Sequence, residues 1–457
     1  LLAAEAYKRV ESENYSHGQK LKLFTFMCRG NIFANNRVYL SLLEKEVLGI
    51  NFLKVDKDSM VKALFYLKSI ITYSPQLKSK LLDFIMQHHE HLNENTFMPL
   101  LSYLEELNCS GNFLAFLNKY IRSTYHKKNF SISVLTLFMY KLAKLGASSE
   151  EVFRDLEKHI LENSEKYNWN LIDLKLLLSS CRLSGFPNSL LYSQLEPEIL
   201  KSLQDPKIDP ESFGNLVFET ASAAHLPSFE LFKVMLERMA GSAELSKGRD
   251  LIDTTKIMRS ISAFIVKYEK LATEKEYQEI YKPVIEGELD KILPHWVSCT
   301  QEILKERDSK MRHRMFQFIL TVHLEFPGLL EKHYVDFDIM KYLKEHKNAE
   351  TTSAASDFSS DIAKVLDRLG MKYELEYKVY VYDIDIFVKP NIAVQAEGRH
   401  HYTKSLTESH RDMLRDFHLQ KLGYKVVKVP FFELSKTVFT EFAKRKEYLE
   451  SLLFEKN

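Results

Sequence analysis

The sequence predicts a mostly helical protein, an α-solenoid of helical hairpins followed by a small C-terminal α/β domain. Glycine and proline are scarce, at 14 and 12 residues in a chain of 457, so the chain has few turns. Apolar residues recur with the helical period up to about residue 345, and the period becomes strand-like after about residue 370. These observations favour helices over a β-sandwich or β-barrel.

The helical region, from about residue 20 to 345, is predicted to consist of repeated hairpins. Its turns contain small or polar residues and recur at steps of 36, 39 and 40 residues, measured from Ser74 to Ser110, Gly146 to Gly185 and Pro187 to Pro227. A period of about 40 residues built from helical hairpins is typical of an α-solenoid, in which neighbouring hairpins bury each other's apolar faces. An irregular all-helical domain is the alternative. Residues 251–326 fit the repeat less well and predict a pair of longer helices.

The boundary of the helical region is predicted from a change in composition. Residues 346–356 are small and polar, so we expect a helical region at 1–345, a linker at 346–357 and a C-terminal domain at 358–457. The four cysteines lie far apart without a CxxC pair, which indicates core thiols in a reducing compartment. No apolar run is long enough for a membrane span, and because the sequence begins without Met, a targeting presequence cannot be read from it.

The C-terminal domain is predicted to have the order α-β-β-β-α-β-α. The helices are expected at about 358–369, 407–422 and 438–453, and the strands at 373–381, 382–388, 392–396 and 424–429. Gly370 is expected to end the first helix, and residues 382–388 alternate in polarity as a half-buried strand does. A hairpin followed by a helical crossover to one more strand is the core order of the restriction-endonuclease-like fold.

Four segments of this domain resemble the RAP domain, in the same order along the chain. They are YDIDIF at 382–387, IAVQAEGRHHY at 392–402, KLGYKVVKVP at 421–430 and KRKEYL at 444–449. Helical repeats in front of a C-terminal RAP domain are also similar to the arrangement of the FAST kinase-like proteins. The resemblance implies a degenerate restriction-endonuclease-like fold and RNA binding in mitochondria or plastids.

The catalytic pattern of the related nucleases is not preserved in this sequence. Those enzymes place an Asp on the second strand and an acidic-x-Lys triplet on the third, and two carboxylates hold a divalent cation. Asp385 matches the first position, but Gln395 replaces the carboxylate and Glu397 replaces the lysine. We therefore expect no catalytic residue, metal or cofactor, although Asp385 and Glu397 could still bind Mg²⁺ together. The alternative roles are a hydrogen bond between Asp385 and the next loop and, for Glu397, a turn before Gly398 or a salt bridge to Arg399. A further alternative is that the cleft of the nuclease-like fold serves as an RNA-contact surface.

The RNA contacts are expected in a local basic cluster, because the formal net charge of the chain is only +1. The cluster surrounds the third strand, the following helix and the fourth strand: Arg399, His400, His401, Tyr402, Lys404, Arg411, Arg415 and Lys425. Arginine binds phosphate with two parallel hydrogen bonds, and Tyr402 could stack on a base. Adjacent His400 and His401 point to opposite sides of an extended segment, so they cannot easily share an ion. A solvated face is the alternative for the cluster. It is the favoured interpretation of the basic runs at 120–128 and 310–314 in the helical region.

The sequence thus predicts a non-catalytic RNA-binding protein of the mitochondrial matrix, with the plastid as the alternative. Its expected partners are ribosomal RNA or organellar transcripts and the other proteins of a ribonucleoprotein particle. Near-neutral charge favours a component of, or factor for, the mitochondrial ribosome over a free factor for RNA processing or stability. A Mg²⁺-dependent endoribonuclease and a pure protein-interaction scaffold remain the competing hypotheses.

Overall fold

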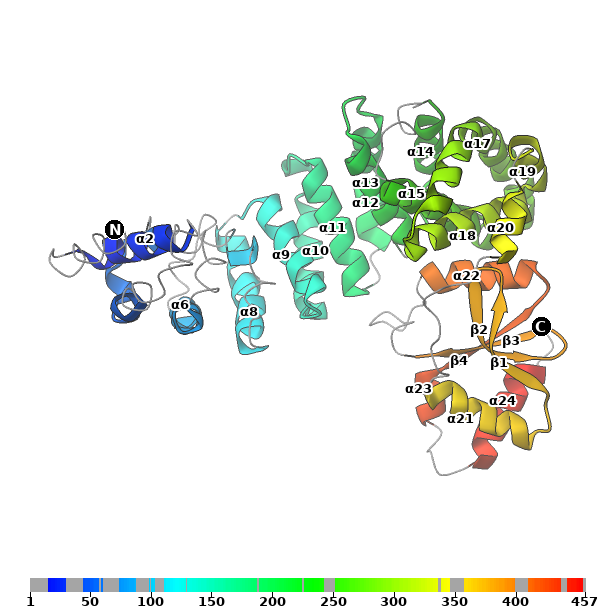
Figure 1. The fold of residues 1–457 in the computed structure, drawn as a ribbon. Helices are drawn as coiled ribbons and strands as arrows, with labels where there is room; N and C mark the ends of the chain where they lie inside the picture. The colour runs from blue at the N-terminus through cyan, green and yellow to red at the C-terminus, as the bar shows by residue number, and fades with distance from the viewer. Residues whose placement is uncertain are drawn as a thin grey trace. The chain divides into compact units, whose positions relative to one another are not determined.

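The fold is described by a computed structural model of the chain (Figure 1). The described residues are 15–29, 44–56, 59–60, 74–87, 98, 100–102, 111–128, 130–186, 189–223, 226–241, 251–335, 338–345, 357–398, 410–436 and 442–454. The chain divides into two compact units, Leu1–Ser184 and Gly185–Asn457. The predicted linker at 346–357 lies outside the described residues except for Asp357, so its boundaries stay a prediction.

The first unit is built from helices that stack as hairpins. Helix α9 packs against α11 and α8 packs against α10, so helices two apart in sequence are neighbours. Leu135, Phe138 and Leu142 of α9 are buried at helical spacing, as the sequence predicts. The bounds are α2 (His17–Arg29), η1 (Phe52–Lys54), α6 (Pro75–Gln87), α8 (Gly111–Lys128), α9 (Ile132–Lys144), α10 (Glu150–Glu162), η3 (Ser164–Lys166) and α11 (Leu171–Ser184).

The second unit repeats this packing in its first helices, since α12 packs against α14 and α13 packs against α15. Its helices are α12 (Ser189–Gln204), α13 (Pro210–Ser222), α14 (Phe229–Gly241), α15 (Leu251–Leu271), α16 (Glu274–Glu276), the π-helix η5 (Tyr277–Tyr281), α17 (Lys282–Lys305), α18 (Ser309–Glu325), α19 (Pro327–His333) and α20 (Ile339–Glu345). The pairwise stacking in both units confirms the predicted α-solenoid of hairpins.

Residues 251–326 contain three long helices, α15, α17 and α18, so the prediction of a pair was wrong. Two side-chain caps explain the extra break. Thr273 begins α16 with a capping box, in which its hydroxyl accepts from the backbone N–H of Glu276 at 3.2 Å. Asp308 begins α18, because its carboxylate accepts from the N–H of Lys310 at 2.7 Å. Among the described helices, none is both long and apolar enough to cross a membrane.

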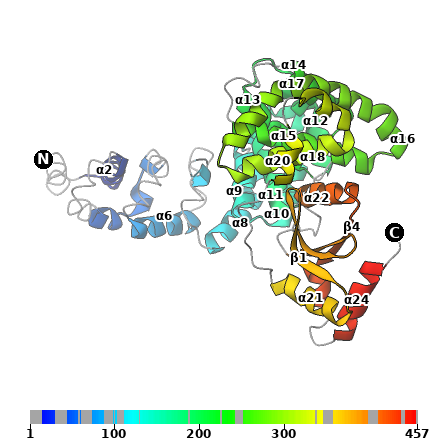
Figure 2. The same cartoon turned by 45° about the vertical axis from the view of Figure 1, so that its right-hand side comes forward.

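The C-terminal domain contains a four-stranded sheet in the order β1-β2-β3-β4, which confirms the predicted hairpin and crossover. Its elements are α21 (Asp357–Arg368), β1 (Tyr373–Val379), β2 (Tyr382–Val388), β3 (Ile392–Glu397), α22 (His410–Lys421), β4 (Lys425–Pro430), α23 (Phe431–Lys436) and α24 (Phe442–Phe454). Strand β2 pairs antiparallel with both β1 and β3, and β4 runs parallel to β3 after the helical crossover α22. Figure 2 shows the edge strands β1 and β4 with α22 on one side and α21 and α24 on the other. The short helix α23 was not predicted.

Helices cover both faces of this sheet. Ile362 of α21 and Leu449 of α24 pack with Ile386 on one face, whereas Leu419 of α22 packs with Ile384 on the other. Gly370 has a φ of +69° and ends α21, as predicted, because an L side chain is strained in that conformation. The sheet therefore lies between α22 on one face and α21 with α24 on the other. The side of α22 that faces away from the sheet contacts the helical region of the same unit.

Candidate nucleic-acid interface

Helix α22 joins the C-terminal domain to helices α15 and α18. Leu414 and Phe417 of α22 pack on the buried Val266 of α15. Lys421, at the end of α22, binds Glu269 of α15 at 3.0 Å and Glu325 of α18 at 2.8 Å. Apolar and ionic contacts together therefore hold the C-terminal domain against two neighbouring helices.

A chain of buried hydrogen bonds crosses the same junction. The Thr321 hydroxyl donates to the backbone carbonyl of Gln317 at 2.9 Å, so it accepts from His418 Nε2–H at 2.8 Å. His418 Nδ1 is then the acceptor for the Tyr382 hydroxyl at 2.7 Å, and Gln317 Nε2 donates to the same hydroxyl at 3.4 Å. Burial lowers the pKa of His418 to about 3 and raises the pKa of Tyr382, so both side chains are neutral near pH 7. The sequence did not predict this network, because a histidine on an amphipathic helix gives no indication of which residue it will contact.

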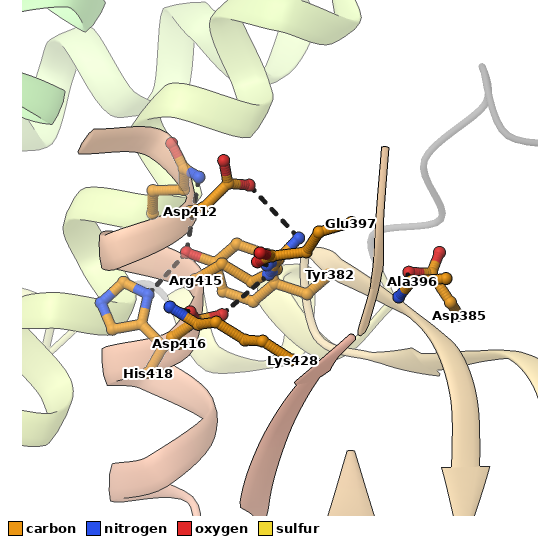
Figure 3. A network of polar contacts seen from close by, with 10 residues as sticks. Tyr382, Asp385, Ala396, Glu397, Asp412, Arg415, Asp416, His418 and Lys428 are labelled. Carbon is orange, nitrogen blue, oxygen red and sulfur yellow. Dashed lines mark hydrogen bonds and ion pairs between the residues drawn. The ribbon is translucent and has the colours of Figure 1, made fainter. Parts of the chain in front are cut away.

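Next to this junction, three carboxylates surround the guanidinium of Arg415 (Figure 3). Arg415 lies 3.3 Å from Glu397 of β3, 3.3 Å from Asp412 and 3.0 Å from Asp416, measured between nitrogen and oxygen atoms. Lys428 of β4 binds Asp416 at 2.6 Å. The Arg415 side chain is only 12% exposed, so the ion pairs form away from bulk water.

The neighbouring carboxylates stabilise the positively charged form of Arg415. Burial alone would lower the pKa of Arg415, but the charges of Asp416, Asp412 and Glu397 outweigh burial and raise it. The guanidinium supplies the positive charge that clustered carboxylates need. Within the described parts of the chain, no group of three or more His, Cys, Asp or Glu side chains is arranged to hold a metal ion.

Asp385 lies where the alternation of β2 is interrupted, which the regular pattern of the sequence did not predict. In a regular strand Ile384 and Ile386 would share a face, but Ile384 packs with Phe387 against α22 and Ile386 packs against α21 and α24. Opposite Asp385, Glu376 of β1 has a φ of 49°. The β1–β2 register has no pair between Glu376 and Asp385, although pairing continues on both sides of this position among the described strand residues. Both strands therefore invert their faces at this position.

The carboxylate of Asp385 forms a hydrogen bond with the neighbouring strand β3. Its Oδ2 accepts a hydrogen bond from the backbone N–H of Ala396 at 2.8 Å. Burial, followed by the charges of Asp385 and Asp383, raises the pKa of Glu376. Figure 3 shows Asp385 beside Ala396, apart from the Arg415 cluster that contains Glu397. The two carboxylates expected to converge on a metal in a nuclease therefore have different surroundings.

Gln395 occupies the remaining position of the nuclease triplet. It is 1% exposed, and its Nε2 atom has no hydrogen-bond partner among the described residues. Gln395 pairs with Lys428 in the parallel β3–β4 register and alternates with the apolar Val394 of the opposite face. Its neutral carbonyl is a weak ligand for a hard cation, and its burial places it in the core of the domain.

The predicted RNA-contact residues have different outcomes. Arg411 belongs to α22, but its side chain is outside the described part of the structure. Lys425 donates to the carbonyl of Leu453 at 3.0 Å and so binds the C-terminal end of α24. The three carboxylate partners of Arg415 leave its guanidinium little capacity for a phosphate. The other predicted contacts lie outside the described residues: Arg399, His400, His401, Tyr402 and Lys404.

Comparison with known families identifies the C-terminal domain. Residues 394–452 match the family model of the RAP domain. The match covers β4, α22, α23, most of α24 and the last strand residues of β3, and includes the Arg415 cluster. No curated protein matches the chain. The chain therefore carries a RAP domain, which suggests that it binds RNA.

Proposed function

We propose that this protein is a non-catalytic RNA-binding protein of mitochondria, acting as a component of, or factor for, the mitochondrial ribosome. The RAP domain at 394–452 carries the proposal of RNA binding. The preceding helical hairpins are the proposed scaffold for other proteins of the particle. The near-neutral net charge of +1 supports a particle subunit, which contacts proteins as well as RNA, and ribosomal RNA is the proposed ligand.

The proposal that the domain does not cut RNA is supported by three side chains at the nuclease positions. Asp385 accepts from the Ala396 N–H, Glu397 pairs with Arg415, and Gln395 is neutral and buried. Metal-assisted hydrolysis needs converging carboxylates that are available to a cation. Here the protein's own arginine takes the place of that cation, so the domain has a nuclease-like shape without an open metal site among the described residues.

Binding and cleavage can be tested with the full chain and labelled RNA. We expect fluorescein-labelled mitochondrial ribosomal RNA fragments to bind, with an affinity that decreases as salt is added. We also expect the RNA to stay intact with and without Mg²⁺. Metal-dependent cleavage that is lost in Asp385→Ala would replace this proposal with an endoribonuclease, and an absence of RNA binding would favour a protein scaffold.

The cellular assignment needs a separate measurement. We expect the native protein to fractionate with the mitochondrial matrix and to sediment with a ribosomal subunit. Sedimentation apart from the subunits, with transcripts bound, would favour a free processing or stability factor. Fractionation with plastids would move the same function to the alternative organelle.

A further inference from the structure

One face of helix α18 extends beyond the part that contacts the C-terminal domain. Residues at intervals of three or four positions form a single stripe along this helix: Lys310, Arg314, Gln317, Thr321 and Glu325. We infer that the two cations at the N-terminal end of the stripe, Lys310 and Arg314, contact phosphates of RNA that is bound to the RAP domain. The inference rests on the proposed function and adds an RNA contact in the helical region.

The C-terminal part of the stripe is the face on which the C-terminal domain docks. Three of its residues each contact one side chain of that domain: Gln317 contacts Tyr382 at 3.4 Å, Thr321 contacts His418 at 2.8 Å and Glu325 binds Lys421 at 2.8 Å. On the same face, Arg314 lies about one helical turn before Gln317, and Lys310 lies about two turns before it. The cations therefore continue the docking face towards the start of α18.

A ring contact shows that the C-terminal domain extends to the level of these cations. The rings of His313 and Tyr382 meet edge to face, with centroids 6.2 Å apart. His313 directly precedes Arg314 on α18, and Tyr382 is the first residue of β2. The cationic end of the stripe therefore lies beside the docked domain.

Helices α22 and α18 run in the same direction where they meet. His418 contacts Thr321 and Lys421 binds Glu325, so the contacts follow the same order along both helices. The N-terminal end of α22 therefore points towards the cationic end of the stripe. In the sequence, the segment 399–404, where RNA contacts are predicted, precedes α22. RNA bound by that segment would have Lys310 and Arg314 within its reach.

The protein does not compensate the two charges by ion pairs. Lys310 is exposed and Arg314 is half-buried, and no carboxylate of the described residues lies within ion-pair distance of either side chain. The charges of Asp308 and Asp253 act on Arg314 from farther away. Asp308 accepts from backbone N–H groups at the start of α18, and Asp253 binds Lys256 at 2.7 Å. Both carboxylates therefore already have other partners.

The half-buried guanidinium of Arg314 is suited to an external anion. Burial lowers the pKa of Arg314, and the charges of Asp308 and Asp253 offset this effect only in part. A guanidinium that loses water without gaining an ion pair is left with an uncompensated desolvation cost. A phosphate would supply the missing charge, and its oxygens accept two parallel hydrogen bonds from the planar fork of arginine.

The segment around the cations favours a polyanion as the ligand. Residues 305–314 contain five Lys or Arg residues and two acidic residues, which leaves +3 in a chain whose formal net charge is +1. None of these five cations forms an ion pair with a described residue. Locally concentrated positive charge attracts the phosphate backbone of a nucleic acid. An acidic protein is also a polyanion, but the RAP domain beside the stripe favours RNA.

The test measures the affinity of the full chain for fluorescein-labelled, mixed-sequence single-stranded RNA over a range of salt concentrations. Lys310→Gln/Arg314→Gln should bind about tenfold more weakly at low salt, because two phosphate contacts are lost. The slope of log K against log salt should decrease in magnitude by about 1.4, since each contact on a single strand contributes about 0.7.

Two further variants separate local phosphate contacts from general effects. Lys291→Gln/Lys332→Gln removes the same net charge from exposed lysines of α17 and α19, and its slope should be unchanged. Arg314→Lys keeps both positive charges of the stripe and should keep most of the slope, which distinguishes lost charge from a folding defect.

The outcomes for this stripe and for the RAP domain can be distinguished. An unchanged slope and affinity in Lys310→Gln/Arg314→Gln would overturn the inference, while RNA binding by the RAP domain would stand. An equal loss in Lys291→Gln/Lys332→Gln would also overturn it, because the effect would then come from net charge alone. A wild type that binds no RNA would overturn the proposed function as well.

Discussion

Arg415 and Arg314 lie on opposite sides of the same junction and differ in how their charge is compensated. Arg415 is 12% exposed and contacts three carboxylates from β3 and α22. Arg314 is half-buried on α18, and the described residues place no carboxylate within ion-pair distance of it. Because the surroundings of the two charges differ, replacing each arginine should have a different effect on stability.

A basic residue therefore cannot be assigned to RNA contact from its place in the sequence alone. The sequence favoured Arg415 as an RNA contact and favoured a solvated face for the run at 310–314. Asp412 and Asp416 lie on the same helix as Arg415, whereas Glu397 lies on β3 and reaches Arg415 only in the folded domain.

Replacing Arg415 by methionine should strongly destabilise the C-terminal domain. The change removes the guanidinium that the buried Glu397, Asp412 and Asp416 share, and breaking such a buried network costs about 3–5 kcal/mol. Urea unfolding followed by circular dichroism measures the loss. The control Arg122→Met removes an arginine whose side chain is 44% exposed and whose partners Glu151 and Asp155 are also exposed, so its loss should be clearly smaller. Equal losses in the two variants would contradict the role given to the Arg415 cluster.

The stability of the junction should decrease as the pH falls from about 6.5 towards 3. The unfolded chain protonates His418 in this range, whereas the folded chain keeps it neutral because burial lowers its pKa to about 3. One proton taken up on unfolding changes the free energy of unfolding by about 1.4 kcal/mol per pH unit. His418→Gln should remove this part of the slope in pH-dependent unfolding. A variant with the wild-type slope would show that other groups control it.

Tyr382→Phe should have an intermediate effect on the same junction. The substitution removes the hydroxyl that donates to His418 and accepts from Gln317, so the free energy of unfolding should fall by about 1–3 kcal/mol. Tyr373→Phe is the matched control, because its hydroxyl makes an exposed hydrogen bond to Asp367. Thermal unfolding of both variants measures the difference. A smaller loss in Tyr382→Phe than in Tyr373→Phe would refute the importance of the network.

The smallest effect on stability is expected from Arg314→Gln. Because no ion pair to a described residue is lost, the free energy of unfolding should stay within about 0.5 kcal/mol of the wild type. The same urea experiment that is used for Arg415→Met measures it. A loss as large as that of Arg415→Met would mean that Arg314 supports the fold, and the contrast between the two arginines would disappear.

Much of the fold could be predicted because periodicity and turn residues are local signals. The helical hairpins, the strand order and the end of α21 at Gly370 follow from spacing that a single segment contains. The inverted alternation at Asp385 could not be predicted, since it depends on Glu376 across the strand pair and on the Ala396 N–H. The extra helix α23 starts directly after Pro430, where the sequence indicated only the end of a strand.

Some features of the site could also be predicted, because residue type is a local signal. Asp385, Gln395 and Glu397 were interpreted as a degenerate nuclease set from residue type alone, because a neutral amide and a missing lysine can be read directly, and this interpretation stays a prediction. The burial of Arg415 and the partner of His418 depend on how α22 packs between the sheet and α18. That packing joins residues almost a hundred positions apart, so no local pattern contains it.

RNA crosslinking on the full chain tests whether the RAP domain contacts RNA. Ultraviolet crosslinking to bound RNA, followed by mass spectrometry of the peptides, should give adducts in the segment around Arg399 to Lys404. An absence of RNA adducts in the RAP domain would contradict RNA binding by this domain.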